Sequence, residues 1–349
     1  MVFVESGKPL ECLIVEVDDP KPGEVVVRTV IAGVCGTDAH RLDGDLPDLG
    51  YPVAFGHEGI GEIVALGEGV STDHAGVRVT TGDLVYFTPS SSTPDARPLT
   101  GWPPAADSSS PAAYQDFATL PLANAFHRIA EDTDPEAVIA FGCAMPTALG
   151  GMARLGGIQP GQTVVVQGSG PVGLSATFLA GLTLARQVIV IGDPVNRLAA
   201  AEILGATGTI PLSDTSVEER RQRVLELTGG VGADVVIECT GRMEAFGEGM
   251  ALLADDGRYL VLGIYSGHGT VPLDAVQLNN RSLSVIGSLG ASTLADYRTT
   301  IQLAQRHGER LGFADLITHR FGLEDLEQAI GVARQGEAIK AVIQPSLDN

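Results

Sequence analysis

The hydrophobic pattern divides the chain into an early part of short apolar runs and a later part in which such runs alternate with longer amphipathic stretches. Between about residues 10 and 85, β-branched runs separated by glycine-rich turns include Gly23–Ala32, Gly61–Gly67 and Asp83–Phe87. Their length and partial alternation predict strands. Many short strands between turns are typical of a barrel-like β unit.

After about residue 137 the pattern becomes one of alternating strands and helices. A helical stretch runs through Cys143 to Leu155. We then predict strands at Thr163–Gln167, Gln187–Ile191, Ala233–Glu238 and Arg258–Leu262, and helices at Pro171–Leu184, Pro194–Leu204 and Met243–Leu253. Strands separated by helices of roughly 10–15 residues predict a parallel sheet wound on both faces.

The wound pattern ends near Thr293, and a helix pair and a last strand ending at Ile343 are expected after it. The stretch Thr88–Pro111 is rich in Ser, Pro, Asp and Ala, which predicts a long loop. We therefore expect an α/β chain with two domains. Residues 1–146 and 292–349 form the β-rich domain, and residues 147–291 form the doubly wound domain.

Composition and charge narrow the classes of function. With 349 residues and 44% hydrophobic content, the chain can bury two cores. A net charge of -21 repels nucleic-acid phosphates and anionic membrane surfaces. The stretch Met1–Lys8 lacks the apolar run of a signal peptide, and no run approaches about 18 apolar residues. We expect a cytoplasmic protein with no nucleic-acid or membrane partner.

The cysteines indicate metal binding rather than disulfides. None of the four, Cys12, Cys35, Cys143 and Cys239, is close to another in sequence, and reduced thiols suit a cytoplasmic metal site. Cys35, His57 and Cys143 together would give Zn²⁺ two thiolates and one imidazole. The fourth tetrahedral position would stay open, as catalytic zinc requires. The alternative is that each of the three residues only packs in a core.

A glycine-rich turn follows the predicted strand Thr163–Gln167. Its sequence Gly168-Ser169-Gly170-Pro171-Val172-Gly173 opens a predicted helix, which is the context that a dinucleotide-binding motif needs. Gly168 permits the tight turn, Gly170 allows a pyrophosphate to approach the backbone, and Gly173 allows helix and strand to pack closely. The N-terminus of the helix, at Pro171 and Val172, then faces the phosphates. An ordinary glycine-rich turn is the alternative.

The choice of cofactor is expected at the end of the second strand of this unit. A carboxylate there binds the adenosine ribose and disfavours a 2′-phosphate. Gly192 stands where we place the acidic residue, and Asp193 follows it. Arg197, four residues beyond Asp193, could instead admit NADP. We favour NAD and keep NADP as the alternative.

Four motifs together resemble the zinc-dependent alcohol dehydrogenases of the medium-chain dehydrogenase/reductase superfamily, over essentially the whole chain. They are Cys-Gly-Thr-Asp-x-His at 35–40, Gly-His-Glu-Gly at 56–59, the dinucleotide motif at 168–173, and Gly-Ser-Leu-Gly at 287–290. The resemblance implies a GroES-like catalytic domain, a Rossmann cofactor domain, and oxidation of an alcohol or reduction of a carbonyl. Secondary alcohols, polyols and amino alcohols are all possible substrates.

The resemblance also implies a role for each site residue. Cys35, His57 and Cys143 match the ligands of the catalytic zinc, and Glu58 matches a carboxylate beside the metal. Asp38 matches a partner that sets the tautomer of the ligand histidine. Thr37 matches the hydroxyl that takes the proton from the substrate, and His40 matches the outer end of that proton path.

The sequence departs from many relatives in one respect. The region that corresponds to their four structural-zinc cysteines, Thr88–Pro111, contains no cysteine, so we expect one zinc per chain. A homodimer or homotetramer is expected because relatives associate in this way. Two alternatives remain, a zinc-independent enone or quinone reductase of the same superfamily and a non-catalytic cofactor-binding protein.

Overall fold

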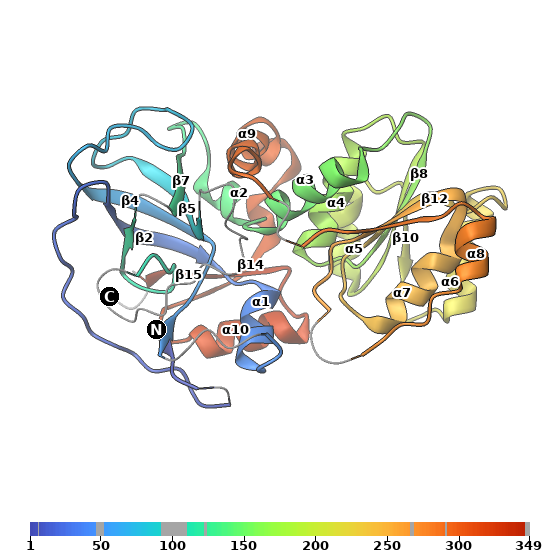
Figure 1. The fold of residues 1–349 in the computed structure, drawn as a ribbon, viewed down its shortest axis with the longest axis horizontal. Coiled ribbons are helices and arrows are strands. Elements are labelled where there is room, and N and C mark those ends of the chain that lie inside the picture. The colour runs from blue at the N-terminus through green and yellow to red at the C-terminus, as the bar shows by residue number, and fades with distance from the viewer. Residues whose placement is uncertain are drawn as a thin grey trace. The chain divides into compact units, whose positions relative to one another are not determined.

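The computed structural model describes residues 1–5, 7–46, 52–91, 110–121, 124–265, 269–289 and 292–345. The chain folds into two compact units. Unit 1 comprises Met1–Cys143 and Thr293–Asn349, and unit 2 comprises Ala144–Ser292. The chain therefore leaves unit 1 once, completes unit 2, and returns (Figure 1).

Unit 1 is built on a mixed sheet with the strand order β14-β15-β2-β4-β5-β7, and β6 also pairs with β2. Its strands are β2 (Val25–Gly33), β4 (Gly59–Leu66), β5 (Leu84–Ser91), β6 (Phe117–Leu120), β7 (Asn124–Arg128), β14 (Ile317–Phe321) and β15 (Lys340–Ile343). A two-stranded sheet joins β1 (Val2–Phe3) to β3 (Val53–Ala54). The β-rich nature predicted for this part of the chain is confirmed.

The sheet of unit 1 holds together because its strands present apolar side chains to a common core. Val25, Val27, Phe55, Phe87 and Ile343 are among the core residues, each at most 1% exposed. Full burial of one such side chain contributes about 1.5–3 kcal/mol. This core anchors the strands from which the loops and short helices of unit 1 extend.

Four α-helices and one 3₁₀ turn complete the described part of unit 1. They are α1 (Gly36–Leu42), α2 (Pro135–Ile139), α9 (Leu294–Leu311), α10 (Leu326–Gln335) and the 3₁₀ turn η1 (Ala314–Leu316). Helix α1 packs against α10, and α2 packs against α9. Helix α1, which follows directly after Cys35, is thus supported by a helix from the C-terminal part of the chain.

Unit 2 is a six-stranded parallel sheet with the order β10-β9-β8-β11-β12-β13. The strands are β8 (Thr163–Gln167), β9 (Gln187–Gly192), β10 (Gly208–Pro211), β11 (Ala233–Glu238), β12 (Leu253–Val261) and β13 (Ser284–Gly287). Its helices are α3 (Ala144–Leu155), α4 (Pro171–Gly181), α5 (Val195–Ile203), α6 (Val217–Leu227), α7 (Met243–Leu252) and α8 (Ala275–Asn280).

Both faces of this sheet are covered, which explains the unbroken apolar run in β8. Val164, Val165 and Val166 are all fully buried, as expected for a strand with helices on either side. Helix α4 packs against α3 and α5, whereas α6 packs against α7 (Figure 1). The strand order reverses between β8 and β11, and ligands of such sheets bind at the carboxyl ends of the strands at this switch point.

The sequence predicted the doubly wound sheet and missed several short elements. Helix α1 was not predicted because seven residues with few apolar positions show no helical period. Strand β5 continues to Ser91, beyond the predicted start of the loop at Thr88, because β7 pairs with it. Residues 92–109 of that predicted loop, and Gly290 of the fourth motif, lie outside the described residues.

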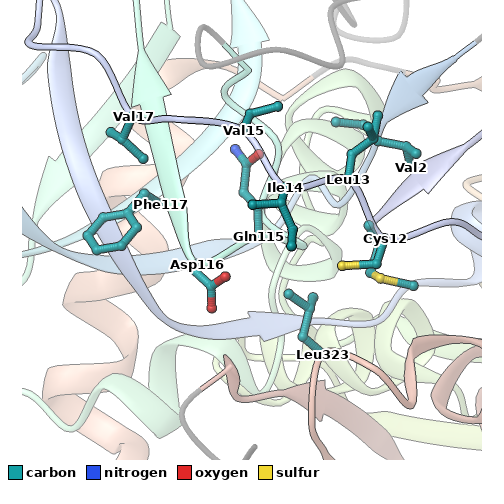
Figure 2. Close-up of a pocket in the computed structure, with 12 residues that line it drawn as sticks. Val2, Cys12, Leu13, Ile14, Val15, Val17, Gln115, Asp116, Phe117 and Leu323 are labelled. Carbon is teal, nitrogen blue, oxygen red and sulfur yellow. The ribbon is translucent and has the colours of Figure 1, made fainter.

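One pocket of unit 1 lies away from the predicted site residues. It has a volume of about 150 Å³ and is lined mainly by the extended segment Cys12–Val17 and by Gln115–Phe117, as Figure 2 shows. None of the predicted metal ligands lines it. Among the residues that the structure describes, no helix is both long and apolar enough to cross a membrane.

Candidate metal centre and cofactor loop

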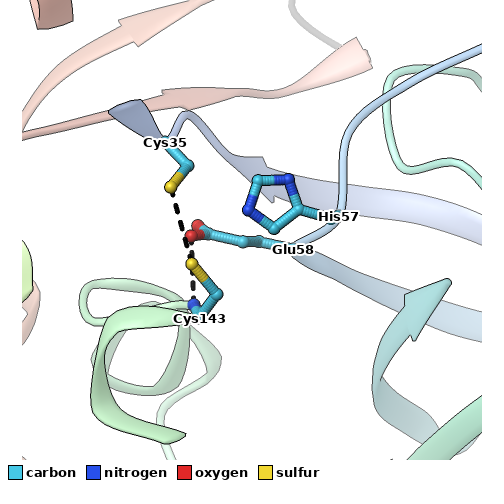
Figure 3. A group of neighbouring side chains, drawn as sticks. All are labelled: Cys35, His57, Glu58 and Cys143. Carbon is cyan, nitrogen blue, oxygen red and sulfur yellow. Dashed lines mark hydrogen bonds between the residues drawn. The ribbon is translucent and has the colours of Figure 1, made fainter. Parts of the chain in front are cut away.

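Four side chains from three distant segments of unit 1 meet in one cluster (Figure 3). Cys35 precedes α1, His57 and Glu58 precede β4, and Cys143 precedes α3. One ligand atom from each of the four residues lies within 4.8 Å of the others. The structure therefore brings together all three predicted ligands and the predicted neighbouring carboxylate.

The chemistry of this cluster fits a zinc ion. The two sulfur atoms, Sγ of Cys35 and Sγ of Cys143, are 3.5 Å apart. Two thiolates bound tetrahedrally at about 2.3 Å would lie roughly 3.8 Å apart, so a small adjustment suffices. Two sulfurs and one imidazole form a donor set that suits zinc and does not suit magnesium or calcium.

The charged neighbours of the cluster set which of its atoms hold protons that a metal ion would have to displace. The hydrogen bond from the thiol of Cys143 holds the pKa of Cys35 well below its usual value. Cys35 raises the pKa of Cys143 in return, so loss of the proton from one sulfur opposes its loss from the other. Burial lowers the pKa of His57, but the nearby charges of Asp38 and Cys35 outweigh it and raise the pKa above its usual value. A cation would displace these protons.

A buried hydrogen-bond network centred on Asp38 supports the segments that carry Cys35 and His57. Asp38 Oδ1 lies 3.5 Å from Nδ1 of His57, which leaves Nε2 as the nitrogen available to a metal. Asp38 Oδ2 accepts a hydrogen bond from the backbone N–H of Cys35 at 2.9 Å and from the hydroxyl of Tyr114 at 2.7 Å. The expected partner of the histidine is therefore in place, and Tyr114 is an addition that the sequence did not indicate.

Glu58 is held by two partners. Its Oε1 accepts the backbone N–H of Cys143 at 3.0 Å, and its Oε2 forms a buried ion pair with Lys340. Burial lowers the pKa of Lys340, but the charge of Glu58 outweighs this and raises it above its usual value. The ammonium therefore stays charged and balances the carboxylate beside the sulfurs.

Lys340 was missed by the sequence analysis, although one signal was available. It is the single charged residue in the apolar stretch Ala338–Ile343, and its side chain is 1% exposed. A charged residue inside a buried strand needs a charged partner. That partner, Glu58, is 282 residues away in sequence, so the strand pattern alone could not identify it.

The two residues predicted to move the proton both lie on α1. The Oγ1 of Thr37 is 3.6 Å from Sγ of Cys35, and Thr37 is 8% exposed. His40 is three residues later, on the same side of the helix. Nδ1 of His40 lies 3.1 Å from Oδ2 of Asp45, and the side chain of His40 is 34% exposed. The helix thus leads from the cluster to the surface.

The predicted phosphate loop joins β8 to α4 in unit 2. Gly168 has φ +103°, a left-handed conformation that favours glycine. A Cβ at Gly173 would overlap the carbonyl oxygen of Gly168, whereas a Cβ at Gly170 would meet nothing within 4 Å. Gly170 is the N-cap of α4, and Pro171 and Val172 open the helix. The open position and the free N–H groups of the first turn fit a bound phosphate.

Gly192, where the acidic residue was expected, leaves no room for a side chain in its present surroundings. A Cβ at Gly192 would collide with the side chain of Ser169. The hydroxyl of Ser169 donates to the carbonyl of Asp193 at 2.8 Å, and the carboxylate of Asp193 accepts the backbone N–H of Ser213 at 2.6 Å. Arg197 lies in the first turn of α5, and burial lowers its pKa.

Comparison with known proteins places this geometry in a family. Residues 21–126 match the alcohol dehydrogenase GroES-like domain family, and residues 171–306 match the zinc-binding dehydrogenase family. The chain is 40% identical to a 5-exo-hydroxycamphor dehydrogenase of Pseudomonas putida, over 99% of this chain and 98% of the relative.

Solved structures agree with the sequence matches. An alcohol dehydrogenase of Thermotoga maritima superposes with a TM-score of 0.89 at 29% identity, covering 99% of this chain and 98% of that one. A putative zinc-binding dehydrogenase of Sinorhizobium meliloti bound to NADP superposes with a TM-score of 0.78 at 25% identity, covering 95% of this chain and 94% of that one. The expected fold, a GroES-like domain with a Rossmann domain, is confirmed. The chain is an enzyme that belongs to the zinc-type alcohol dehydrogenases of the medium-chain dehydrogenase/reductase superfamily.

Proposed function

We propose that this enzyme is a zinc-dependent dehydrogenase that oxidises a secondary alcohol on an apolar, ring-shaped carbon skeleton. The observation that carries the zinc proposal is the meeting of Cys35, His57 and Cys143 within one cluster. The substrate class follows the 40% identity with a relative named for hydroxycamphor. Residues 1–146 and 292–349 serve as the catalytic domain, and residues 147–291 bind the cofactor.

Cys35, His57 and Cys143 would hold the zinc. When bound, the zinc supplies a Lewis acid and the nicotinamide supplies a hydride acceptor. The carboxylate of Glu58 lies within the same cluster and is balanced by Lys340, so it can approach a metal during ligand exchange without adding net charge to the buried site. Asp38 keeps the imidazole of His57 in one orientation.

The chain also provides a path for the proton that leaves the alcohol. The hydroxyl of Thr37 lies beside the sulfur of Cys35, so it can accept that proton near the cluster. His40 is partly exposed and can release a proton to solvent. In the reverse direction the same two residues return the proton to the carbonyl oxygen.

NAD is the proposed cofactor, bound at Gly168–Gly173. Asp193 directly follows β9. Its backbone carbonyl accepts a hydrogen bond from the hydroxyl of Ser169 in the phosphate loop. A negative charge at this point repels the 2′-phosphate of NADP. Arg197 offers the competing interaction, so NADP is the alternative. The ratio of kcat/KM for the two cofactors tests this, and Asp193→Ala should move the ratio toward NADP.

A panel of substrates tests the proposed reaction. Bicyclic secondary alcohols, polyols and amino alcohols are assayed with NAD and NADP, before and after dialysis against a chelator. We expect turnover of the apolar secondary alcohols, loss of turnover after chelation, and recovery with zinc. Preferential turnover of polyols or amino alcohols would overturn the substrate class and leave the zinc chemistry intact.

The competing function is that of a zinc-independent enone or quinone reductase. Such an enzyme needs no thiolate cluster, so the proximity of Cys35 and Cys143 favours the zinc enzyme. Enone reduction that survives complete removal of zinc would favour the reductase.

We further propose that the enzyme forms a homodimer through the edge of the unit 2 sheet. Strand β13 is one of the two edge strands of this sheet, and the side chain of Val285 on it is 40% exposed. Helix α8 buries none of its residues, and Val276 on it is 66% exposed. An exposed edge with apolar side chains favours pairing with a second copy. Sedimentation of the wild type and of Val285→Lys tests this, and a homotetramer is the alternative outcome.

A further inference from the structure

Tyr114 connects the segment that carries His57 with the segment that carries Cys35. Its backbone N–H donates to the carbonyl of Phe55 at 3.2 Å, and the N–H of Ala113 donates to the carbonyl of Gly56 at 2.9 Å. The chain around Tyr114 is therefore paired with the two residues directly before His57.

The hydroxyl of Tyr114 reaches the other segment. It lies 2.7 Å from Asp38 Oδ2 and 2.9 Å from the carbonyl oxygen of Gly33. A phenol has one hydrogen to donate, and the charged carboxylate is both the nearer and the stronger acceptor. The same Oδ2 accepts the N–H of Cys35, so the hydroxyl completes the hydrogen bonding on that side of the carboxylate.

The position of the phenol ring is determined by its packing. Tyr114 is 1% exposed, and its ring meets that of Phe55 edge to face at 5.2 Å. Gly56 has φ +100°, and a Cβ there would lie 2.8 Å from the ring. Burial holds the pKa of Tyr114 well above its usual value, so the hydroxyl remains a neutral donor.

We propose that Tyr114 is a positioning residue for the metal cluster, acting through Asp38 on the imidazole of His57 and on the Cys35 loop. This inference rests on the proposed zinc site. A buried carboxylate that loses one of its donors becomes free to rotate or to recruit water. Removing such an outer partner of a metal ligand typically weakens metal binding about 10–100-fold.

The chain offers a matched control. Tyr86 is also 1% exposed and lies in the same unit, but its hydroxyl has no hydrogen-bond partner among the described residues. Tyr114→Phe and Tyr86→Phe each remove one buried hydroxyl and keep the ring. Only the first removes a hydrogen bond to Asp38.

The experiment measures zinc affinity by competition with a chromogenic chelator, and the cobalt(II)-substituted enzyme is examined by absorption spectroscopy. We expect about 10–100-fold weaker zinc binding and an altered thiolate-to-cobalt band for Tyr114→Phe, and less than about twofold change for Tyr86→Phe. Asp38→Asn should weaken binding to a similar extent. The double variant should be little weaker than Asp38→Asn alone, because the two residues act in series.

Unchanged affinity and an unchanged cobalt spectrum in Tyr114→Phe would overturn the proposal. So would additive losses in the double variant, or full affinity in Asp38→Asn, and the last result decides the matter even if Tyr114→Phe does not fold. Failure of the zinc site itself is distinguishable, because the wild type would then show neither tight zinc binding nor a thiolate-to-cobalt band.

Discussion

The metal cluster of unit 1 and the phosphate loop of unit 2 are built in opposite ways. The cluster is made of the side chains of Cys35, His57, Glu58 and Cys143. Asp38, Tyr114 and Lys340 support it through hydrogen bonds and an ion pair. The loop is made of backbone from six consecutive residues, 168–173, between one strand and one helix. The first depends on tertiary packing, and the second depends on local backbone conformation.

This difference determines what a mutation does in each region. In the cluster, each side chain has a charged or polar neighbour, so removing one leaves another without its partner in a buried place. In the loop, the glycines are needed because they have no side chain, so adding a methyl group is the harmful change.

Loss of a ligand from the cluster should have the largest effect. Cys35→Ser replaces a thiolate with a hydroxyl that binds zinc weakly, and we expect kcat/KM to fall at least about 1000-fold, which corresponds to about 4 kcal/mol. Steady-state kinetics with added zinc measures it. Cys12→Ser, at an exposed cysteine outside the cluster, is the control and should keep wild-type turnover.

Loss of the buried cation should destabilise unit 1. Lys340→Met leaves the carboxylate of Glu58 buried without its ion pair, and breaking such a pair costs about 3–5 kcal/mol. Urea unfolding measures the loss. In Lys340→Met combined with Glu58→Gln most of it should be regained, and an equal loss in both variants would contradict the ion-pair explanation.

Two histidines of unit 1, His57 and His127, have pKa values shifted in opposite directions. The charges around His57 raise its pKa, whereas burial lowers the pKa of His127 from 6.5 to about 4. As the pH falls, His127 in the unfolded chain therefore takes up a proton at a higher pH than His127 in the folded chain does. The corresponding stability is present above pH 6.5 and is lost as the pH falls toward 4, by about 3 kcal/mol.

The variant His127→Phe tests this pH dependence. Urea unfolding of the wild type and of the variant is compared between pH 7 and pH 4. The difference in unfolding free energy between the two proteins should change by about 3 kcal/mol across this range. A constant difference would show that His127 does not titrate in this way.

In the phosphate loop, two glycines should respond differently to the same added methyl group. At Gly173 the methyl overlaps the carbonyl of Gly168, and we expect Gly173→Ala to lose about 1–3 kcal/mol of stability and to bind NAD poorly. At Gly170 the methyl has open space, so Gly170→Ala should keep its stability and lose only cofactor affinity. Calorimetry of NAD binding and urea unfolding separate the two.

The smallest effect is expected at Tyr86. Its buried hydroxyl has no partner in the part of the chain that the structure describes, so Tyr86→Phe should raise stability by about 1 kcal/mol. Tyr114→Phe should lower it. A loss of stability in both variants would mean that Tyr86 has a partner that the described residues do not reveal.

The same contrast explains how far the sequence could predict the molecule. The strand β8 and the loop after it were predictable, because apolar runs and glycine spacing are local. The ligand residues were found through short motifs, such as Gly-His-Glu-Gly at 56–59. Lys340 and Tyr114 were not found, because each owes its place to contacts with residues far away in sequence. Helix α1 was missed because it is short and has no apolar period.

X-ray absorption at the zinc edge tests the central claim most directly. If Cys35, His57 and Cys143 hold the metal, the purified enzyme contains one zinc per chain, with two sulfur neighbours at about 2.3 Å and lighter atoms at about 2.0–2.2 Å. Cys35→Ser should then retain one sulfur neighbour or lose the metal. A fully active enzyme whose zinc has no sulfur neighbour, or that contains no zinc, would contradict the account.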